Sequence, residues 1–163
     1  MSGYTTVEEM EQEDTQKGKY LTFSLGSEDY GLEIKYVTEI IGIQEITVVP
    51  ELPDYLKGII NLRGNIIPVM DVRLRFKKPS IAYNDRTCVI VVDIKGISVG
   101  LIVDAVAEVI SIQDEDVVQP PEVTRGDSNR YIKAIGKIGS EVKLILDCFK
   151  LLNDDEIESL ENI

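Results

Sequence analysis

The residues that most often carry out chemistry are scarce in this chain of 163 residues, which contains two cysteines and no histidine. Without an imidazole, a Ser-His or Cys-His nucleophile pair and a histidine-ligated metal are excluded. Cys88 and Cys148 each lie in an apolar stretch, and two thiols are too few for a four-thiolate zinc site. This pattern predicts two buried free thiols, with neither a metal nor a cofactor.

The remaining candidates for catalysis are also weak. Neither the P-loop spacing nor the G-x-G-x-x-G pattern occurs. Asp114-Glu115-Asp116 lacks the glycine and the distal glutamate of a calcium loop, so we interpret it as a solvated turn. Other carboxylates are scattered, without the aromatic residues that line a carbohydrate cleft. The sequence therefore predicts that the protein is not an enzyme.

The charge points to protein partners. The chain has 29 acidic and 17 basic residues, and its net charge of −12 argues against binding to a nucleic acid backbone. Most of that charge lies at the two ends, with −4 over residues 1–18 and −5 over 151–163, which leaves −3 for 19–150. A nearly balanced body suits protein–protein contact better than the capture of a polyanion.

The beginning of the chain carries no apolar signal sequence, and no run approaches eighteen apolar residues. We therefore expect a cytoplasmic protein without direct membrane insertion. Residues 1–18 are polar and acidic without a sustained period, which predicts a mobile tail.

The body consists of short apolar runs separated by turn signals, which predicts a mainly β domain with barrel-like strand spacing. Expected strands lie at 20–25, 30–34, 40–49, 58–62, 65–69, 87–94, 97–103, 106–112, 131–138 and 142–146. The end of the chain, 153–163, is predicted to form an acidic helix. Asn153 and Glu156 have the spacing of a capping box, and Ile157, Leu160 and Ile163 can face the body.

The chain also repeats itself. With a shift of 69 residues, 30–49 aligns with 99–118 without a gap, and nine of the twenty positions are identical. A later shift of 76 aligns 58–71 with 134–147. Two similar β subdomains follow, at about 19–78 and 86–150. With about five strands each, both suggest a small barrel, since closure protects strand edges.

The hairpin at 58–71 holds the first candidate for a binding site. Arg63-Gly64 is a tight-turn signal, and the repeat has Gly139 in place of Arg63, so the fold does not require an arginine there. Arg63 is either a solubilising surface residue or, beside Asn61, an anchor for a protein interface.

Glu39 is the second candidate. Its counterpart Glu108 in the repeat favours a shared structural role, such as a turn or a cap. Its neighbours Val37, Ile40 and Ile41 are apolar, and an apolar strip with one carboxylate is also typical of a partner-binding surface. The sequence alone does not separate the two interpretations.

A family resemblance adds to these patterns. Gly58-Ile-Ile-Asn-Leu-Arg-Gly-Asn-Ile-Ile-Pro-Val-Met-Asp71 resembles the signature hairpin of CheW, the coupling protein of bacterial chemotaxis. Further matches follow in the family's order over about 19–152. They are Leu21-Thr-Phe-Ser-Leu, Tyr30-Gly-Leu-Glu-Ile, Val37-Thr-Glu-Ile, Tyr83-Asn-Asp and Val99-Gly-Leu-Ile-Val-Asp.

The resemblance implies two five-stranded SH3-like barrels around a shared core, short helices and no catalysis. It implies an adaptor that connects the tips of methyl-accepting chemoreceptors to the regulatory domain of the histidine kinase CheA, in arrays at the inner face of the membrane. By their match to the family's motif, Glu39 and Arg63 correspond to charged partner-binding positions, with the two charges able to pair. Val37 and Ile40 correspond to an apolar strip on the receptor side, and Gly58 to a glycine that opens the hairpin.

Two other functions stay open at this point. The chain could serve a similar kinase array with an output other than chemotaxis, or it could sense a small ligand in the groove between the barrels. We expect the isolated protein to be a monomer, because the implied contacts are with other proteins.

Overall fold

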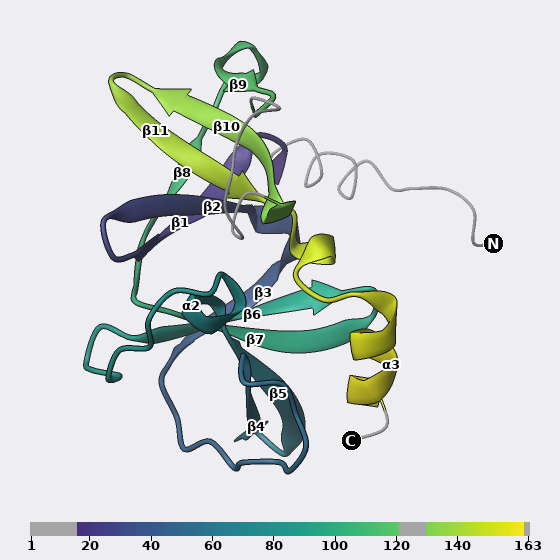
Figure 1. Cartoon of the computed structure of the whole chain (residues 1–163). Coiled ribbons are helices and arrows are strands. Elements are labelled where there is room, and N and C mark those ends of the chain that lie inside the picture. The colour runs from purple at the N-terminus through teal and green to yellow at the C-terminus, as the bar shows by residue number, and fades with distance from the viewer. Residues whose placement is uncertain (1–15, 121–129, 162–163) are drawn as a thin grey trace, which may run out of the picture.

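The computed structural model describes residues 16–120 and 130–161, which form a mainly β fold of two sheets with a few short helices (Figure 1). The strands are β1 (Lys19–Leu25), β2 (Glu28–Glu33), β3 (Val37–Gly42), β4 (Leu56–Leu62), β5 (Asn65–Asp71), β6 (Cys88–Ile94), β7 (Ile97–Val103), β8 (Ala105–Ser111), β9 (Val117–Val118), β10 (Ile132–Ile138) and β11 (Glu141–Leu146). The helices are η1 (Ile34–Tyr36), α2 (Val72–Arg75), η2 (Asp114–Asp116), η4 (Cys148–Lys150) and α3 (Asp154–Glu161). The predicted mainly β fold with short helices is confirmed, with six strands in one sheet and five in the other. The tail expected at 1–18 lies outside the described residues except for its last three.

One expected strand is misplaced. The apolar run 40–49 was expected to form a single strand, but β3 begins earlier and ends at Gly42. Only Thr47 from the second part of that run pairs again, in an isolated bridge to Ile59 of β4. Apolar content alone therefore gave the wrong end for this strand.

Each sheet takes its strands from both repeats. The first sheet has the order β8-β1-β2-β11-β10-β9 and the second has the order β3-β6-β7-β5-β4. The hairpins β1–β2 and β6–β7 occupy equivalent places in the repeat, and each of them pairs with strands from the other half of the chain. The sheets consequently differ from the division expected at 19–78 and 86–150. The chain crosses to the other sheet directly after each hairpin, at η1 and at Asp104, so each half completes the sheet of the other.

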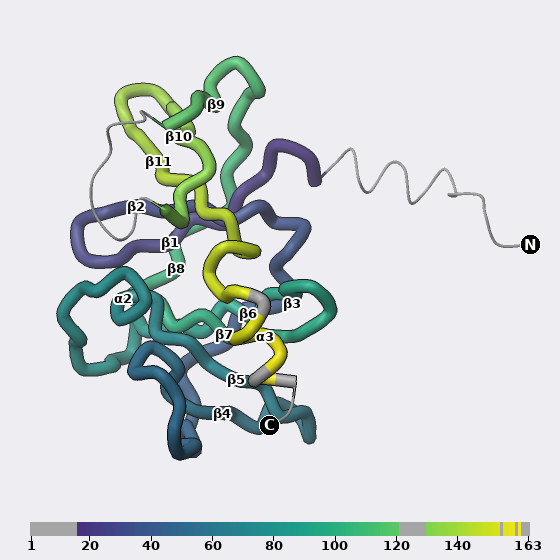
Figure 2. The backbone as a smooth tube through the Cα atoms, turned by 45° about the vertical axis from the view of Figure 1, so that its right-hand side comes forward, coloured from purple at the N-terminus to yellow at the C-terminus, as the bar shows by residue number. Residues whose placement is uncertain are grey.

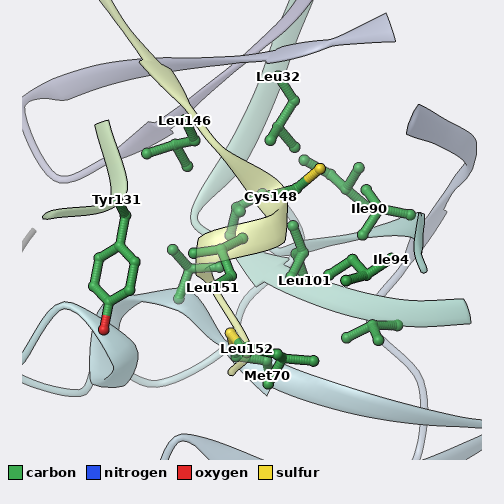
Figure 3. Close-up of a cluster of buried hydrophobic side chains, with 14 of the residues drawn as sticks. Leu32, Met70, Ile90, Ile94, Leu101, Tyr131, Leu146, Cys148, Leu151 and Leu152 are labelled. Carbon is green, nitrogen blue, oxygen red and sulfur yellow. The ribbon is translucent and has the colours of Figure 1, made fainter. Parts of the chain in front are cut away.

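Each sheet has a small core of its own, and a larger core contains residues of both sheets. Figures 1 and 2 show how the two sheets lie next to each other. The shared core includes Leu32 of β2, Ile90 of β6 and Leu101 of β7, together with Cys148 and Leu151 near the C-terminal end (Figure 3). Because this core joins strands of both sheets to η4 and the residues after it, neither sheet buries its apolar face alone.

Strand β6 shows why part of the sequence is continuously apolar. Val89 and Val91 face the core of the second sheet, while Ile90 and Val92 face the shared core. A strand that is buried on both faces needs apolar residues at successive positions rather than at alternate ones. This explains the run from Cys88 to Val92.

The two cysteines are free thiols, as predicted. Cys148 is buried in the shared core, whereas Cys88 is only half-buried, so the expectation of burial holds fully for one of them. Burial raises the pKa of the Cys148 thiol to about 11, and the nearby Asp147 carboxylate adds to this effect.

Helix α3 begins with the predicted capping box. The backbone N–H of Glu156 donates to Asn153 Oδ1 at 2.7 Å, and the backbone N–H of Asn153 donates to Glu156 Oε1 at 3.0 Å. Ile157 and Leu160 are buried against the shared core, which fixes the helix beside the second sheet (Figure 1). Ile163 lies outside the described residues.

Candidate partner-binding site

The tip of the β4–β5 hairpin presents Arg63 in a strained conformation. Leu62 pairs with Asn65, so Arg63 and Gly64 form a two-residue turn with φ angles of +53° and +88°. Such a turn prefers Asn or Gly at both positions, because a Cβ atom is disfavoured in the left-handed region. An arginine at this place is therefore not the choice that the turn itself favours.

Asn61 holds this turn in place. Its side-chain Oδ1 accepts a hydrogen bond from the backbone N–H of Gly64 at 2.8 Å. The β6–β7 hairpin uses the same arrangement, in which Asp93 Oδ1 accepts from the N–H of Gly96 at 2.8 Å. The side-chain oxygen of Asn61 is thus occupied within the turn that carries Arg63.

Arg63 forms an ion pair with Glu39 of β3. Its Nη2 donates to both carboxylate oxygens, at 2.5 Å to Oε1 and 2.7 Å to Oε2. The Arg63 side chain remains 70% exposed and that of Glu39 29% exposed. The hydrogen bond to Glu39 raises the pKa of Arg63, so the guanidinium stays charged. The pair therefore keeps a charge accessible to a partner.

The repeat separates two roles of the Glu39 position. Its counterpart Glu108 lies within an irregularity in the pairing of β8 with β1, and Glu39 directly follows one in the pairing of β3 with β6. There Thr22 Oγ1 donates to the carbonyl of Glu108 at 2.8 Å. No ion pair joins the Glu108 side chain to any residue of the described ranges, and Gly139 stands in place of Arg63. The strand irregularity is shared, whereas the paired charges occur in the first copy alone.

A hollow of about 530 Å³ adjoins the ion pair. It is lined by Glu39 and Arg63 together with apolar side chains, among them Ile66 of β5, Ile97 of β7 and Leu160 of α3. Ile66 is 56% exposed. An exposed apolar side chain beside an arginine is compatible with a protein interface, because arginine is enriched on such surfaces.

Sequence reasoning missed Ile66 and Leu160 as parts of this surface. Ile66 lies opposite Asn61 in the hairpin, on the outward face, so strict alternation along β5 could have indicated its exposure. For Leu160 no local signal exists, because only the packing of α3 against the second sheet brings it to the hollow.

Val37 and Ile40 lie on the same strand as Glu39 but do not line this hollow. Val37 is half-buried and packs against the shared core, while Ile40 is 43% exposed. Their strand thus offers a second apolar surface next to the ion pair rather than a part of the same hollow.

Gly58 is explained by the fold. The backbone of Thr47 forms two hydrogen bonds with Ile59, at 2.8 and 2.9 Å, directly beside Gly58. A Cβ atom at Gly58 would lie 2.1 Å from the carbonyl oxygen of Thr47, and its φ of +144° also favours glycine. This residue therefore shapes β4 and lies away from the turn that carries Arg63.

Fold and site together define a class of protein. Two sheets share one core and expose a charged pair beside an apolar hollow. Within residues 16–120 and 130–161, no three potential metal ligands lie together and no helix could cross a bilayer. This is a small β domain with an open, mixed polar and apolar surface.

The chain belongs to the CheW-like family, because the model of the CheW-like domain matches residues 19–156. The chemotaxis protein CheW of Klebsiella aerogenes is 34% identical over 163 residues, which cover 100% of this chain and 98% of that relative. CheW of Treponema pallidum is 33% identical over 147 residues, covering 88% and 86%. The crystal structure of the scaffolding protein TtCheW from Thermoanaerobacter tengcongensis is similar with a TM-score of 0.79 and 40% identity, covering 85% of this chain and 96% of that chain.

Proposed function

We propose that this chain is a non-enzymatic adaptor that couples the cytoplasmic tips of chemoreceptors to a CheA-type histidine kinase. It would act in the cytoplasm, at the inner face of the membrane. Membership of the CheW-like family supports this, since one relative is named a scaffolding protein and others chemotaxis proteins. The observation that carries the proposal is the exposed Glu39–Arg63 pair, which is held on a turn that would favour a different residue.

The mechanism is linkage through binding. An adaptor that holds kinase and receptor in one geometry lets a small motion of the receptor bias an equilibrium of the kinase. The surface around Arg63 and the apolar strip of Val37 and Ile40 give two adjoining surfaces for such contacts. Interfaces of this kind are modest in area and reversible.

The proposal is tested by reconstitution. The wild-type chain, Arg63→Glu and Arg86→Glu are mixed with a CheA-type kinase and a receptor cytoplasmic fragment, and both binding and kinase activity are measured. Arg86 is an exposed arginine outside both surfaces and gives the same change in charge. We expect Arg63→Glu to lose assembly and receptor-dependent kinase activation with an unchanged far-UV circular dichroism spectrum, while Arg86→Glu assembles normally.

Two results would contradict the proposal. If Arg63→Glu assembles like the wild type, the role of Arg63 as an interface anchor is wrong. If the wild type binds neither protein, the coupling function is wrong. A calorimetric screen of small ligands would then test the sensor alternative.

A further inference from the structure

A second hollow of about 530 Å³ shares no lining residue with the hollow beside Arg63. It lies between α2, η4 and the beginning of α3. We call it the basic groove. Its lining residues include Arg75, Arg130, Tyr131, Phe149, Lys150 and Glu156.

The charge of the basic groove opposes that of the chain as a whole. Four of its ten lining residues are Lys or Arg, and only Glu156 is acidic, although the chain carries 29 acids against 17 bases. Arg130 and Lys150 are exposed at its rim. A local concentration of cations on an otherwise acidic protein attracts acidic ligands.

Aromatic rings hold two of these cations in place. The guanidinium carbon of Arg75 lies 4.2 Å from the centre of the Tyr55 ring, and that of Arg130 lies 4.9 Å from the centre of the Tyr131 ring. Phe149 adds a partly exposed apolar surface at the same place. A partner would therefore meet fixed charges beside rigid aromatic surfaces, the combination that is enriched in binding sites.

The floor of the groove is an ion pair rather than a free cation. Arg75 Nη2 donates to Glu156 Oε1 at 3.0 Å, and Arg75 Nε and Glu156 Oε2 are buried without a hydrogen-bond partner among the described residues. The exposed Arg130 and Lys150 therefore supply the charge that an acidic ligand would contact at the rim.

We propose that the basic groove binds an extended, acidic segment of a partner protein. Carboxylates of that segment contact Arg130 and Lys150 at the rim, and its apolar carbons pack on Tyr131 and Phe149. The site is separate from the Glu39–Arg63 surface, so it gives the adaptor an additional contact and does not depend on the proposed coupling function.

The test uses the full chain and a fluorescein-labelled peptide of twelve residues in which Glu and Ser alternate, since an extended chain points alternate side chains the same way. We expect saturable binding by fluorescence anisotropy, which weakens as salt is raised. Arg130→Glu with Lys150→Glu should raise the Kd at least tenfold. Arg86→Glu, at a residue that does not line the groove, should leave it unchanged, and a Gln-Ser peptide should not bind.

Other outcomes overturn the proposal. Equal binding to the wild type and the double variant, or absence of binding both to the wild type and to the amide variant described next, means that the groove does not recognise acidic segments. A further variant of the full chain replaces the acids of residues 1–15 by their amides. If the peptide binds this variant but not the wild type, the chain's own acidic segment competes for the groove, and a partner's segment is not its occupant.

Discussion

Arg63 and Glu39 connect the two edges of the second sheet. In the strand order β3-β6-β7-β5-β4, Glu39 lies on one outer strand and Arg63 ends the other, yet Arg63 Nη2 lies 2.7 Å from Glu39 Oε2. The Thr47–Ile59 bridge joins the segment that follows β3 to β4 in the backbone. An ion pair this exposed adds little to stability, so we expect its role to lie in binding.

An exchange of the two charges tests whether the partners require the ion pair itself or a guanidinium at position 63. In Glu39→Arg with Arg63→Glu, the pair can form again, so we expect a thermal midpoint close to that of the wild type. Assembly with kinase and receptor should stay lost, because a partner would meet each charge at the wrong place. Restored assembly would instead show that the pair itself is what the partners require.

Replacement of Arg63 by asparagine should improve the turn while it removes the charge. Asn adopts positive φ more readily than Arg, so Arg63→Asn should keep or raise the thermal midpoint. Assembly should still be lost, as in Arg63→Glu. A fall in the midpoint measured by calorimetry would mean that Arg63 is needed for folding.

Glycine positions in the same hairpin should differ in their tolerance. Gly58→Ala places a Cβ atom 2.1 Å from the carbonyl oxygen of Thr47, and we expect a loss of about 3 kcal/mol or more in the free energy of unfolding. In Gly64→Ala the new Cβ atom has no neighbour within 4 Å, so only the positive φ of +88° is unfavourable. We expect this to cost about 1 kcal/mol of the free energy of unfolding. Urea denaturation of both variants measures the difference, and equal losses would contradict the assignment of Gly58 to the fold.

Local structure was predictable from the sequence where residues close together in the chain determine it. The turn at Arg63-Gly64 and the capping box of Asn153 and Glu156 follow from residues at most three positions apart, and both are present in the structure. The repeat correctly aligned Glu39 with Glu108. The same comparison showed that Arg63 has no charged counterpart in the second copy, where Gly139 takes its place.

Pairing between distant segments was not predictable in the same way. The patterns within β1–β2 and β6–β7 do not indicate which sheet each hairpin joins, because the partner strands lie in distant parts of the chain. The basic groove illustrates the same limit, since Arg75, Arg130 and Lys150 are far apart in the chain and form no motif.

The thiols should differ in reactivity. With a pKa of about 11, Cys148 has on the order of one thiolate in a thousand molecules at pH 8, and its burial also blocks the reagent. We expect a maleimide to modify the half-buried Cys88 first in the native protein, and both residues at similar rates in denaturant. Mass spectrometry of tryptic peptides identifies the site, and early modification of Cys148 would contradict its place in the shared core.

The carboxylate of Asp104 links segments of the two sheets. It lies at the crossing from β7 to β8 and accepts hydrogen bonds from Arg73 Nε at 2.7 Å and from the backbone N–H of Gly26 at 2.7 Å. Burial opposes ionisation of Asp104, but the bonds from Arg73 and Gly26 outweigh it, so its pKa lies below the ordinary value. The carboxylate is thus stabilised by folding.

This lowered pKa makes the contribution of Asp104 dependent on pH. An aspartate in the unfolded chain titrates near about 3.9, so the stabilisation is complete above that pH and is lost as the pH falls through the lower pKa of the folded state. Asp104→Asn should reduce the free energy of unfolding by about 2–3 kcal/mol at pH 7, since it leaves Arg73 partly buried without its anion. Urea denaturation between pH 7 and pH 3 should show the difference from the wild type shrinking towards acid, whereas the exposed control Asp54→Asn should differ little at any pH. A difference that stays constant over this range would show that Asp104 acts through its shape rather than its charge.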